Sequence, residues 1–407
     1  MSSSRLVIVD GVRTPFCRAG TDLAALGADE LGRIAVDALL TRTGLDPALV
    51  DEVIFGCVAQ PVDAANVARV IALRAGVPES TPAVTVHRNC ASGFEAVTTA
   101  ADRMAAGRGS VFIVGGVDSM SNIPLLFRET TARKFAAVTK AKTTTRKLAA
   151  FAAFRPSDFE PRIGLKLGLT DPVCGLNMGE TAEILAREDG ITREAQDAFA
   201  LRSHERAIAA AERLAEEICP VYTGSQPVVR DNGPRDGQTA AILAGLRPVF
   251  AKYGNVTAGN SSQVTDGAVA LLVMSEARAA ELGVRPIGAL IDYAYAGCDP
   301  ARMGLGPVFA IDRLAKRCGL QPSDADLIEI NEAFAAQVLA VLQRVPVSDE
   351  KLNVNGGAIA LGHPVGATGA RLILTSLKEL ARRGARRALV SLCVGGGQGG
   401  AIWLERT

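Results

Sequence analysis

A cysteine at residue 90 lies where a predicted strand meets a predicted helix. Residues 82–86, Pro-Ala-Val-Thr-Val, are short, β-branched and bounded by proline, as a buried strand would be, and apolar residues then recur at helical spacing from Phe94 to Gly107. Cys90 is therefore expected at or near a helix N-terminus, where free N–H groups and the helix dipole favour the nucleophilic thiolate. A free cysteine is also an ordinary small buried residue, so a catalytic Cys90 needs partners elsewhere in the chain.

Two polar residues that could serve as partners follow predicted strands in the second half. Asn331 comes directly after the apolar run 327–330. His363 lies within the glycine-rich stretch 355–369, and a proline fixes the chain immediately after it. A histidine in such a loop before a helix is a candidate general base.

A second cysteine, Cys393, ends another predicted strand and precedes a run of glycines that includes Gly395. The backbone N–H groups of such a run are able to form an oxyanion hole, in which one good donor is typically worth ~3 kcal/mol in the transition state. Two strand-end cysteines, a histidine in a glycine-rich loop and a strand-end asparagine together predict nucleophilic acyl transfer.

Predicted strands and helices alternate along the chain, and the alternation restarts near residue 287. This pattern predicts an α/β protein of two similar halves with a largely parallel sheet covered on both faces. In the first half the strands are expected at 6–9, 53–58, 82–86, 111–116 and 269–274, with helices at 28–40, 66–75, 94–107, 177–186 and 192–215. In the second half strands are expected at 287–293, 327–330 and 388–393, with helices at 307–318, from Glu332 and from Gly369.

Composition narrows the class of protein. The chain has 407 residues, 48% of them hydrophobic and 21% charged, and its net charge of +1 gives no general attraction for nucleic acid. The eight cysteines form no CxxC pairs, so neither a disulfide framework nor a metal site is expected. The N-terminus shows no leader, and no apolar run is long enough to span a bilayer, so a cytoplasmic location is expected.

One segment, residues 127–156, departs from this balance. It holds eight basic residues and one acid, Glu129, interleaved with apolar residues. Leu148, Phe151 and Arg155 are predicted to share one helical face. Two interpretations remain open: a solvated face with a few core anchors, or a surface for a membrane or a partner subunit.

The motifs resemble those of thiolases, which are acetyl-CoA and 3-ketoacyl-CoA acyltransferases. The resemblance covers nearly the whole chain, through residues 12–16, 89–93, 246–248, 257–262, 331–334, 355–369 and 393–400. It implies a five-layered α/β/α/β/α fold of two similar halves, residues 1–285 and 286–407. It also implies an inserted loop domain at about 122–255, and homodimers or homotetramers.

The resemblance also implies a role for each candidate residue. Cys90 would attack the 3-keto carbonyl, and the backbone N–H groups of Cys90 and Gly395 would hold the oxyanion. His363 and a water held by Asn331 would stabilise the enolate of acetyl-CoA, and His363 would help to activate Cys90. Cys393 would protonate that enolate and later deprotonate the incoming CoA.

CoA would be a co-substrate, and no permanently bound cofactor is implied. By resemblance, Ser262 would approach the pantetheine, Met178 would line the acyl pocket, and Arg235 would lie near the adenine and phosphates. Short-chain acetoacetyl-CoA thiolases commonly have a histidine just before this methionine, whereas this chain has Asn177. Together with the basic segment, Asn177 favours a 3-ketoacyl-CoA thiolase of fatty-acid β-oxidation that acts on longer acyl chains.

The sequence leaves two other functions open. One is a short-chain acetoacetyl-CoA thiolase, and another is a lipid- or partner-binding subunit of a β-oxidation complex. The presence of Cys90, Asn331, His363 and Cys393 argues for an active enzyme. A ketoacyl synthase commonly pairs its cysteine with two histidines, but neither His87 nor His204 lies in a strand-end glycine loop.

Overall fold

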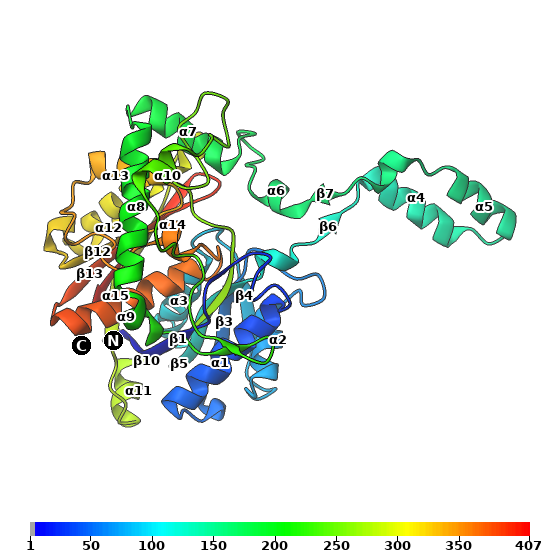
Figure 1. The fold of residues 1–407 in the computed structure, drawn as a ribbon. Helices are drawn as coiled ribbons and strands as arrows, with labels where there is room; N and C mark the ends of the chain where they lie inside the picture. The colour runs from blue at the N-terminus through cyan, green and yellow to red at the C-terminus, as the bar shows by residue number, and fades with distance from the viewer. Residues whose placement is uncertain (1–4) are drawn as a thin grey trace. The chain divides into compact units, whose positions relative to one another are not determined.

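The computed structural model describes residues 5–407 (Figure 1). It divides into two compact units, a large one of residues 5–122 and 171–407 and a small one, Ile123–Thr170. All nine residues predicted for catalysis or substrate binding belong to the large unit. The expected absence of a leader concerns residues 1–4 in part, and these lie outside the described residues.

Ten strands of the described chain form one sheet in the large unit, in the order β12-β13-β14-β11-β1-β10-β5-β3-β4, with β2 paired to β10. Their bounds are β1 Leu6–Arg13, β2 Cys17–Arg18, β3 Glu52–Gly56, β4 Ala83–Val86, β5 Val111–Asp118, β10 Thr265–Ser275, β11 Gly288–Gly297, β12 Leu327–Ile330, β13 Arg387–Val394 and β14 Gln398–Glu405. A further short pair in the same unit joins β8 Val221–Tyr222 to β9 Pro227–Val228.

The expectation of a largely parallel sheet is wrong. Only the pairs β3–β4, β3–β5 and β12–β13 are parallel, and the other pairs in the sheet are antiparallel. β14, a strand that the sequence analysis missed, returns beside β13 after a three-residue turn, so it must run antiparallel. Gly396 and Gly397 have φ values of 90° and 79°, which allow this tight turn.

The topology confirms two similar halves. In the first half, β3 pairs with β5 in parallel, and β5, β10 and β1 then continue antiparallel. In the second half, β12, β13, β14 and β11 repeat the same sequence of directions. The two halves join where β1 pairs with β11.

The helices complete five layers (Figure 1). α1 and α2 pack with the outer face of the first-half strands, and α12 and α13 pack with the outer face of the second-half strands. α3 and α15 lie between the two halves in a core that draws apolar residues from both sets of strands. The bounds in the large unit are α1 Ala28–Thr43, α2 Val67–Arg74, α3 Ser92–Ala105, α7 Met178–Glu188, α8 Arg193–Ala209, α9 Ala211–Ala215, α10 Ala240–Ala244, α11 Glu276–Glu281, α12 Gly306–Cys318, α13 Ala335–Arg344, α14 Ala358–Leu361 and α15 Thr368–Arg383. The predicted five-layered α/β/α/β/α fold is confirmed.

Two predicted helices differ in their bounds. The helix expected over 192–215 is divided into α8 and α9 at Ala210. The helix expected from Glu332 begins three residues later as α13, because Phe334 is extended and serves as its N-cap. Glu332 therefore lies in the turn between β12 and α13.

The small unit is a helical hairpin with an aromatic cluster. It contains β6 Leu125–Leu126, α4 Glu129–Lys140, α5 Thr144–Ala152, β7 Arg162–Ile163 and α6 Gly164–Gly168. Phe135 lies within 6.3 Å, centroid to centroid, of three other phenylalanine rings. Leu148 and Phe151 are on α5, with 65% and 60% of their surface exposed. Arg155 follows the end of α5 and caps the next 3-10 turn, so the predicted helical face of Leu148, Phe151 and Arg155 is wrong for Arg155.

Within residues 5–407, no helix is both long and apolar enough to cross a lipid bilayer.

Candidate active site

A short turn between β4 and α3 presents Cys90. The backbone N–H of Arg88 donates to the Ser92 hydroxyl oxygen at 2.9 Å, and that hydroxyl donates to the carbonyl of Asn89 at 2.7 Å. Asn89 has a φ of 44°, in the left-handed region that asparagine tolerates better than most residues. α3 begins two residues after Cys90, so the predicted strand-to-helix junction is confirmed.

The Asn89 side chain connects this turn to the glycine loop after β13. Its Nδ2 donates to the Gly395 carbonyl at 2.7 Å. The backbone N–H groups of Gly395 and of Cys90 itself face the Cys90 thiol. Two backbone donors therefore lie close to the sulfur.

Burial raises the pKa of the Cys90 thiol above its ordinary value, although the N–H groups of Gly395 and Cys90 act to lower it. The N–H groups act in the expected direction, toward the thiolate, but desolvation outweighs them. Cys90 is a thiol at neutral pH and needs a base.

The geometry around His363 assigns its protonation. The Thr368 hydroxyl donates to the Pro364 carbonyl at 2.8 Å, so its oxygen accepts from His363 Nδ1, 2.7 Å away. Nδ1 then carries the proton, and Nε2 holds the free electron pair. Nε2 lies 3.4 Å from Nδ2 of Asn331.

Electrostatics keep this imidazole neutral. Burial, with a smaller contribution from the Arg371 charge, lowers the pKa of His363 to about 4. The Asn331 side chain is also buried, and its Oδ1 has no hydrogen-bond partner among the described residues. His363 is thus available as a base, and Asn331 has an acceptor available beside it.

Cys393 is fully buried, and burial raises the pKa of its thiol well above the ordinary value, with the neighbouring Cys90 adding to the effect. Met178 packs in the same apolar cluster as Cys393. The Met178 sulfur lies 3.4 Å from the point that a Cβ on Gly395 would occupy. Cys393, the predicted oxyanion donor Gly395 and the predicted acyl-pocket residue Met178 are therefore neighbours.

The Ser262 segment lies against the same site. The backbone N–H of Ser262 donates to the Ala333 carbonyl at 2.9 Å. The backbone N–H of His363 donates to the Gln263 carbonyl at 3.2 Å and to the Thr265 hydroxyl oxygen at 3.1 Å. These bonds place Ser262 close to the turn that carries Asn331 and to the His363 loop.

The described contacts of two further predicted binding residues are local ones. Asn177 caps α7, since its Oδ1 accepts from the backbone N–H of Gly179 and its own N–H donates to Glu180. Arg235 is exposed, and its backbone N–H donates to Nδ1 of His204 at 3.2 Å. The described contacts of Arg235 connect it to His204 on α8, and none joins it to the cysteines.

Comparison with known proteins now decides the family. The model of the thiolase N-terminal domain matches residues 6–277, and that of the thiolase C-terminal domain matches residues 284–406. The chain belongs to the thiolase family.

Relatives of this thiolase carry two kinds of name. An acetyl-CoA acetyltransferase of Cupriavidus necator is 43% identical over 98% of this chain and 99% of that protein. A 3-ketoacyl-CoA thiolase of Salmonella heidelberg is 42% identical over 98% of this chain and 97% of its own length. Like them, this chain is an acyltransferase, and both names fit its family.

Solved thiolase structures share the fold. The acetyl-CoA acetyltransferase of Bacillus anthracis superimposes with a TM-score of 0.91 at 39% identity, covering 100% of this chain and 99% of that one. The human mitochondrial 3-ketoacyl-CoA thiolase, solved in complex with CoA, gives a TM-score of 0.90 at 37% identity, covering 99% and 98%.

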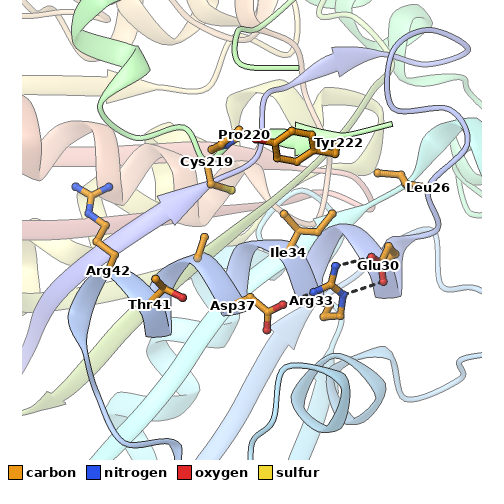
Figure 2. A pocket seen from close by; sticks show the side chains of 11 residues that line it. Leu26, Glu30, Arg33, Ile34, Asp37, Thr41, Arg42, Cys219, Pro220 and Tyr222 are labelled. Atoms are coloured by element: carbon orange, nitrogen blue, oxygen red, sulfur yellow. Dashed lines mark hydrogen bonds and ion pairs between the residues drawn. The ribbon is translucent and has the colours of Figure 1, made fainter. Parts of the chain in front are cut away.

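A pocket elsewhere in this thiolase carries none of the predicted residues. Figure 2 shows it between α1 and the segment 219–222. Its Arg33 is paired with Glu30 and Asp37 on the same helix. Arg42, which also lines the pocket, pairs with Asp10 outside it.

Proposed function

We propose that this thiolase-family enzyme cleaves 3-ketoacyl-CoA with CoA, giving acetyl-CoA and a shortened acyl-CoA through an acyl-enzyme on Cys90. The observation that supports this most directly is the set of groups around the Cys90 sulfur. The N–H groups of Gly395 and Cys90 face it, and Cys393 is a neighbour. This arrangement has a nucleophile, an oxyanion hole and a second thiol.

In the first step His363 Nε2 takes the Cys90 proton, and the sulfur attacks the 3-keto carbon. The carbonyl oxygen becomes an oxyanion held by the N–H groups of Gly395 and Cys90. Because the pKa of His363 is lowered to about 4, the imidazole is in its basic form at neutral pH.

In the second step the bond between C2 and C3 breaks. The acyl group stays on Cys90 as a thioester, and the electron pair passes to the enolate of acetyl-CoA. His363 and a water held by Asn331 stabilise the enolate oxygen. Cys393, which burial keeps protonated, gives its proton to the enolate carbon.

In the third step the Cys393 thiolate takes the proton of the incoming CoA thiol. The CoA sulfur then attacks the thioester, releasing the shortened acyl-CoA. The departing Cys90 sulfur takes back the proton that His363 has held since the first step, which restores both residues. CoA is thus a co-substrate, and no permanently bound cofactor enters the scheme. Ser262 would contact the pantetheine, Met178 and Asn177 the acyl region, and Arg235 the adenine and phosphates.

We expect thiolysis of 3-ketoacyl-CoA substrates of four to sixteen carbons to favour medium or long chains. This expectation rests on Asn177, which caps α7 at the position where short-chain acetoacetyl-CoA thiolases commonly have a histidine. The measurement is kcat/KM for each chain length. Activity confined to acetoacetyl-CoA would support the short-chain alternative, which the relative from Cupriavidus necator also favours. A lack of any activity would revive the subunit hypothesis.

The small unit supports a further part of the proposal, peripheral association with an anionic membrane. Residues 123–170 contain ten basic and three acidic residues. Exposed apolar side chains accompany them, including Phe127, Leu148 and Phe151. Aromatic and aliphatic groups beside lysines and arginines suit the interface of a bilayer with anionic headgroups. A partner subunit is the alternative occupant of this surface.

Vesicle binding tests this proposal. We expect the enzyme to co-sediment with vesicles of phosphatidylserine and phosphatidylcholine, and less well at high salt. Replacing Lys140, Lys142, Arg146 and Lys147 with glutamine should weaken binding by about 10²-fold or more, since each cation contributes about 1 kcal/mol near such a surface. Unchanged binding by this variant would contradict the proposal. If the wild-type enzyme does not bind vesicles either with or without phosphatidylserine, the result would favour a partner subunit as the occupant of this surface.

We also propose the domain limits given by the resemblance, 1–285 and 286–407 with an insertion at about 122–255. The end of β10 at Ser275 and the start of β11 at Gly288 support the first boundary. The compact unit Ile123–Thr170 lies within the proposed insertion.

We propose a homodimer or homotetramer as well. β4 ends the sheet, so one of its edges has no strand beside it within the described chain. All four of its residues are half-buried. A strand edge of this kind suits pairing with a second copy.

A further inference from the structure

A buried carboxylate, Asp118, joins three loops near the Cys90 site. It ends β5 and is fully buried. Its Oδ1 accepts the backbone N–H groups of Val58 and Ala59 at 2.9 and 2.7 Å, and lies 3.5 Å from the Cys57 sulfur. Its Oδ2 accepts the backbone N–H of Gly366 at 2.5 Å.

This carboxylate has no ionic partner. Within residues 5–407, no lysine, arginine or histidine nitrogen forms an ion pair with Asp118. A buried charge is costly unless hydrogen bonds or a counter-charge compensate for it. Here the compensation comes from three backbone N–H groups and the more distant Cys57 thiol, so Asp118 mainly holds backbone in place.

The backbone that it holds includes the end of the His363 loop. Gly366 is three residues after His363 and two before Thr368, which accepts from the imidazole. Gly366 is also tightly enclosed. A Cβ on Gly116 would lie 1.9 Å from the Gly366 carbonyl oxygen, and one on Gly93 would lie 3.0 Å from it. Gly93 belongs to the first turn of α3, directly after the Cys90 turn.

We propose that Asp118 is a positioning residue that fixes His363 relative to Cys90 by anchoring Gly366 against β5 and α3. The inference rests on the proposed roles of His363 and Cys90 and deepens them. Asp118 touches none of the reacting atoms and acts through the loop.

Electrostatics allow this role to be separated from a simple charge effect. The negative charge of Asp118 acts to raise the pKa of the Cys90 thiol. Removing that charge without moving anything would increase the thiolate fraction and speed the alkylation of Cys90. A displaced His363 would have the opposite effect, because Cys90 would lose its base.

The test is Asp118→Asn in the full-length enzyme, followed by the rate of Cys90 alkylation with iodoacetamide at neutral pH. An asparagine has one acceptor oxygen, so its NH₂ group must face the N–H donors on one side. We expect alkylation and kcat to fall by about 10²-fold, the cost of displacing a catalytic group by about an ångström. The double variant with His363→Ala should be no slower than His363→Ala alone, because both changes remove the same contribution.

A matched control and a second variant complete the experiment. Cys57→Ala removes the longest contact of Asp118 and leaves Gly366 anchored, so it should react at the wild-type rate. Gly366→Ala is a second variant for use if Asp118→Asn does not fold, and we expect it to show the same loss of alkylation and turnover. Its Cβ would lie 3.0 Å from the carbonyl oxygens of Gly56 and Val117, which pushes the loop off Asp118.

Three outcomes would overturn the inference. Cys90 in Asp118→Asn could be alkylated at or above the wild-type rate, or the loss of rate from Asp118→Asn could add in full to the loss from His363→Ala in the double variant. The third is a wild-type rate of alkylation in Gly366→Ala. Failure of the proposed function would look different. In that case His363→Ala itself would alkylate and turn over normally.

Discussion

We expect Cys90→Ala to form no acyl-enzyme and to lower thiolysis by about 10³-fold or more, as for loss of the nucleophile from a catalytic group that acts as a unit. The N–H groups of Gly395 and residue 90 would remain in place, since Asn89 holds Gly395 by its carbonyl. An intact oxyanion hole without a sulfur offers nothing to carry the acyl group. Mass spectrometry after incubation with acetyl-CoA should show an acetyl adduct on the wild-type peptide and none on the variant.

Cys318→Ala is the matched control for this experiment. Cys318 is half-buried, as Cys90 is, but its sulfur lies against the Leu314 carbonyl on α12. The control should acylate and turn over at the wild-type rate. An acetyl adduct that persists in Cys90→Ala, or turnover near the wild-type level, would show that another residue is the nucleophile.

Three of the candidate reactive residues were predictable from the sequence because they lie at or just after the end of a strand. Cys90 follows β4, Asn331 follows β12 and Cys393 is near the end of β13. β12 and β13 are parallel neighbours, so Asn331 and Cys393 emerge at the same edge of the sheet. Their residue types and these positions were enough to suggest a shared site.

The residues that orient them were not predictable. These residues, Thr368, Thr265 and Asp118, are of ordinary types. Their roles depend on contacts with the His363 loop that form only in the folded chain. Asp118 and its partner Gly366 are 248 residues apart in sequence. No local pattern encodes such a contact. Asn177 shows the converse, since a side chain singled out for substrate binding is engaged as a helix cap.

The sheet directions show a similar limit. Alternating strands and helices correctly predicted two similar halves. This pattern does not predict a strand that pairs with its neighbour without an intervening helix. β14 follows β13 through a short turn, and β10 enters after the long segment that contains the small unit. Both therefore run antiparallel to their neighbours, which the rule for parallel α/β units does not cover.

The pKa of Cys90 illustrates a competition that sequence leaves undecided. The helix N-terminus and the Gly395 N–H favour the thiolate, whereas burial disfavours it, and burial depends on the packing of both halves around the site. In the proposed mechanism, this raised pKa makes Cys90 dependent on His363 as its base.

His363→Ala should accordingly lower turnover by about 10³-fold. Without the imidazole, Cys90 must lose its proton to solvent, and the raised pKa of the thiol makes this unfavourable at neutral pH. Alkylation of Cys90 in the variant should therefore rise by about tenfold per pH unit until that pKa is reached, since only the thiolate reacts. In the wild type the pKa of His363 is lowered to about 4, so kcat/KM should not fall between about pH 7.5 and 5.5, where an ordinary histidine becomes protonated.

His204→Gln separates the catalytic role from the loss of any buried histidine. His204 is also buried, and burial likewise lowers its pKa to about 4, but its Nδ1 accepts from the backbone of Arg235. Glutamine keeps an acceptor for that bond, so this variant should retain the wild-type pH dependence of alkylation. If His204→Gln and His363→Ala were alkylated equally slowly, or if alkylation of His363→Ala kept the wild-type dependence on pH, His363 could not be the base. A steep pH dependence of alkylation that occurs only in His363→Ala would show that the reactivity of Cys90 depends on the His363 imidazole, which burial keeps neutral.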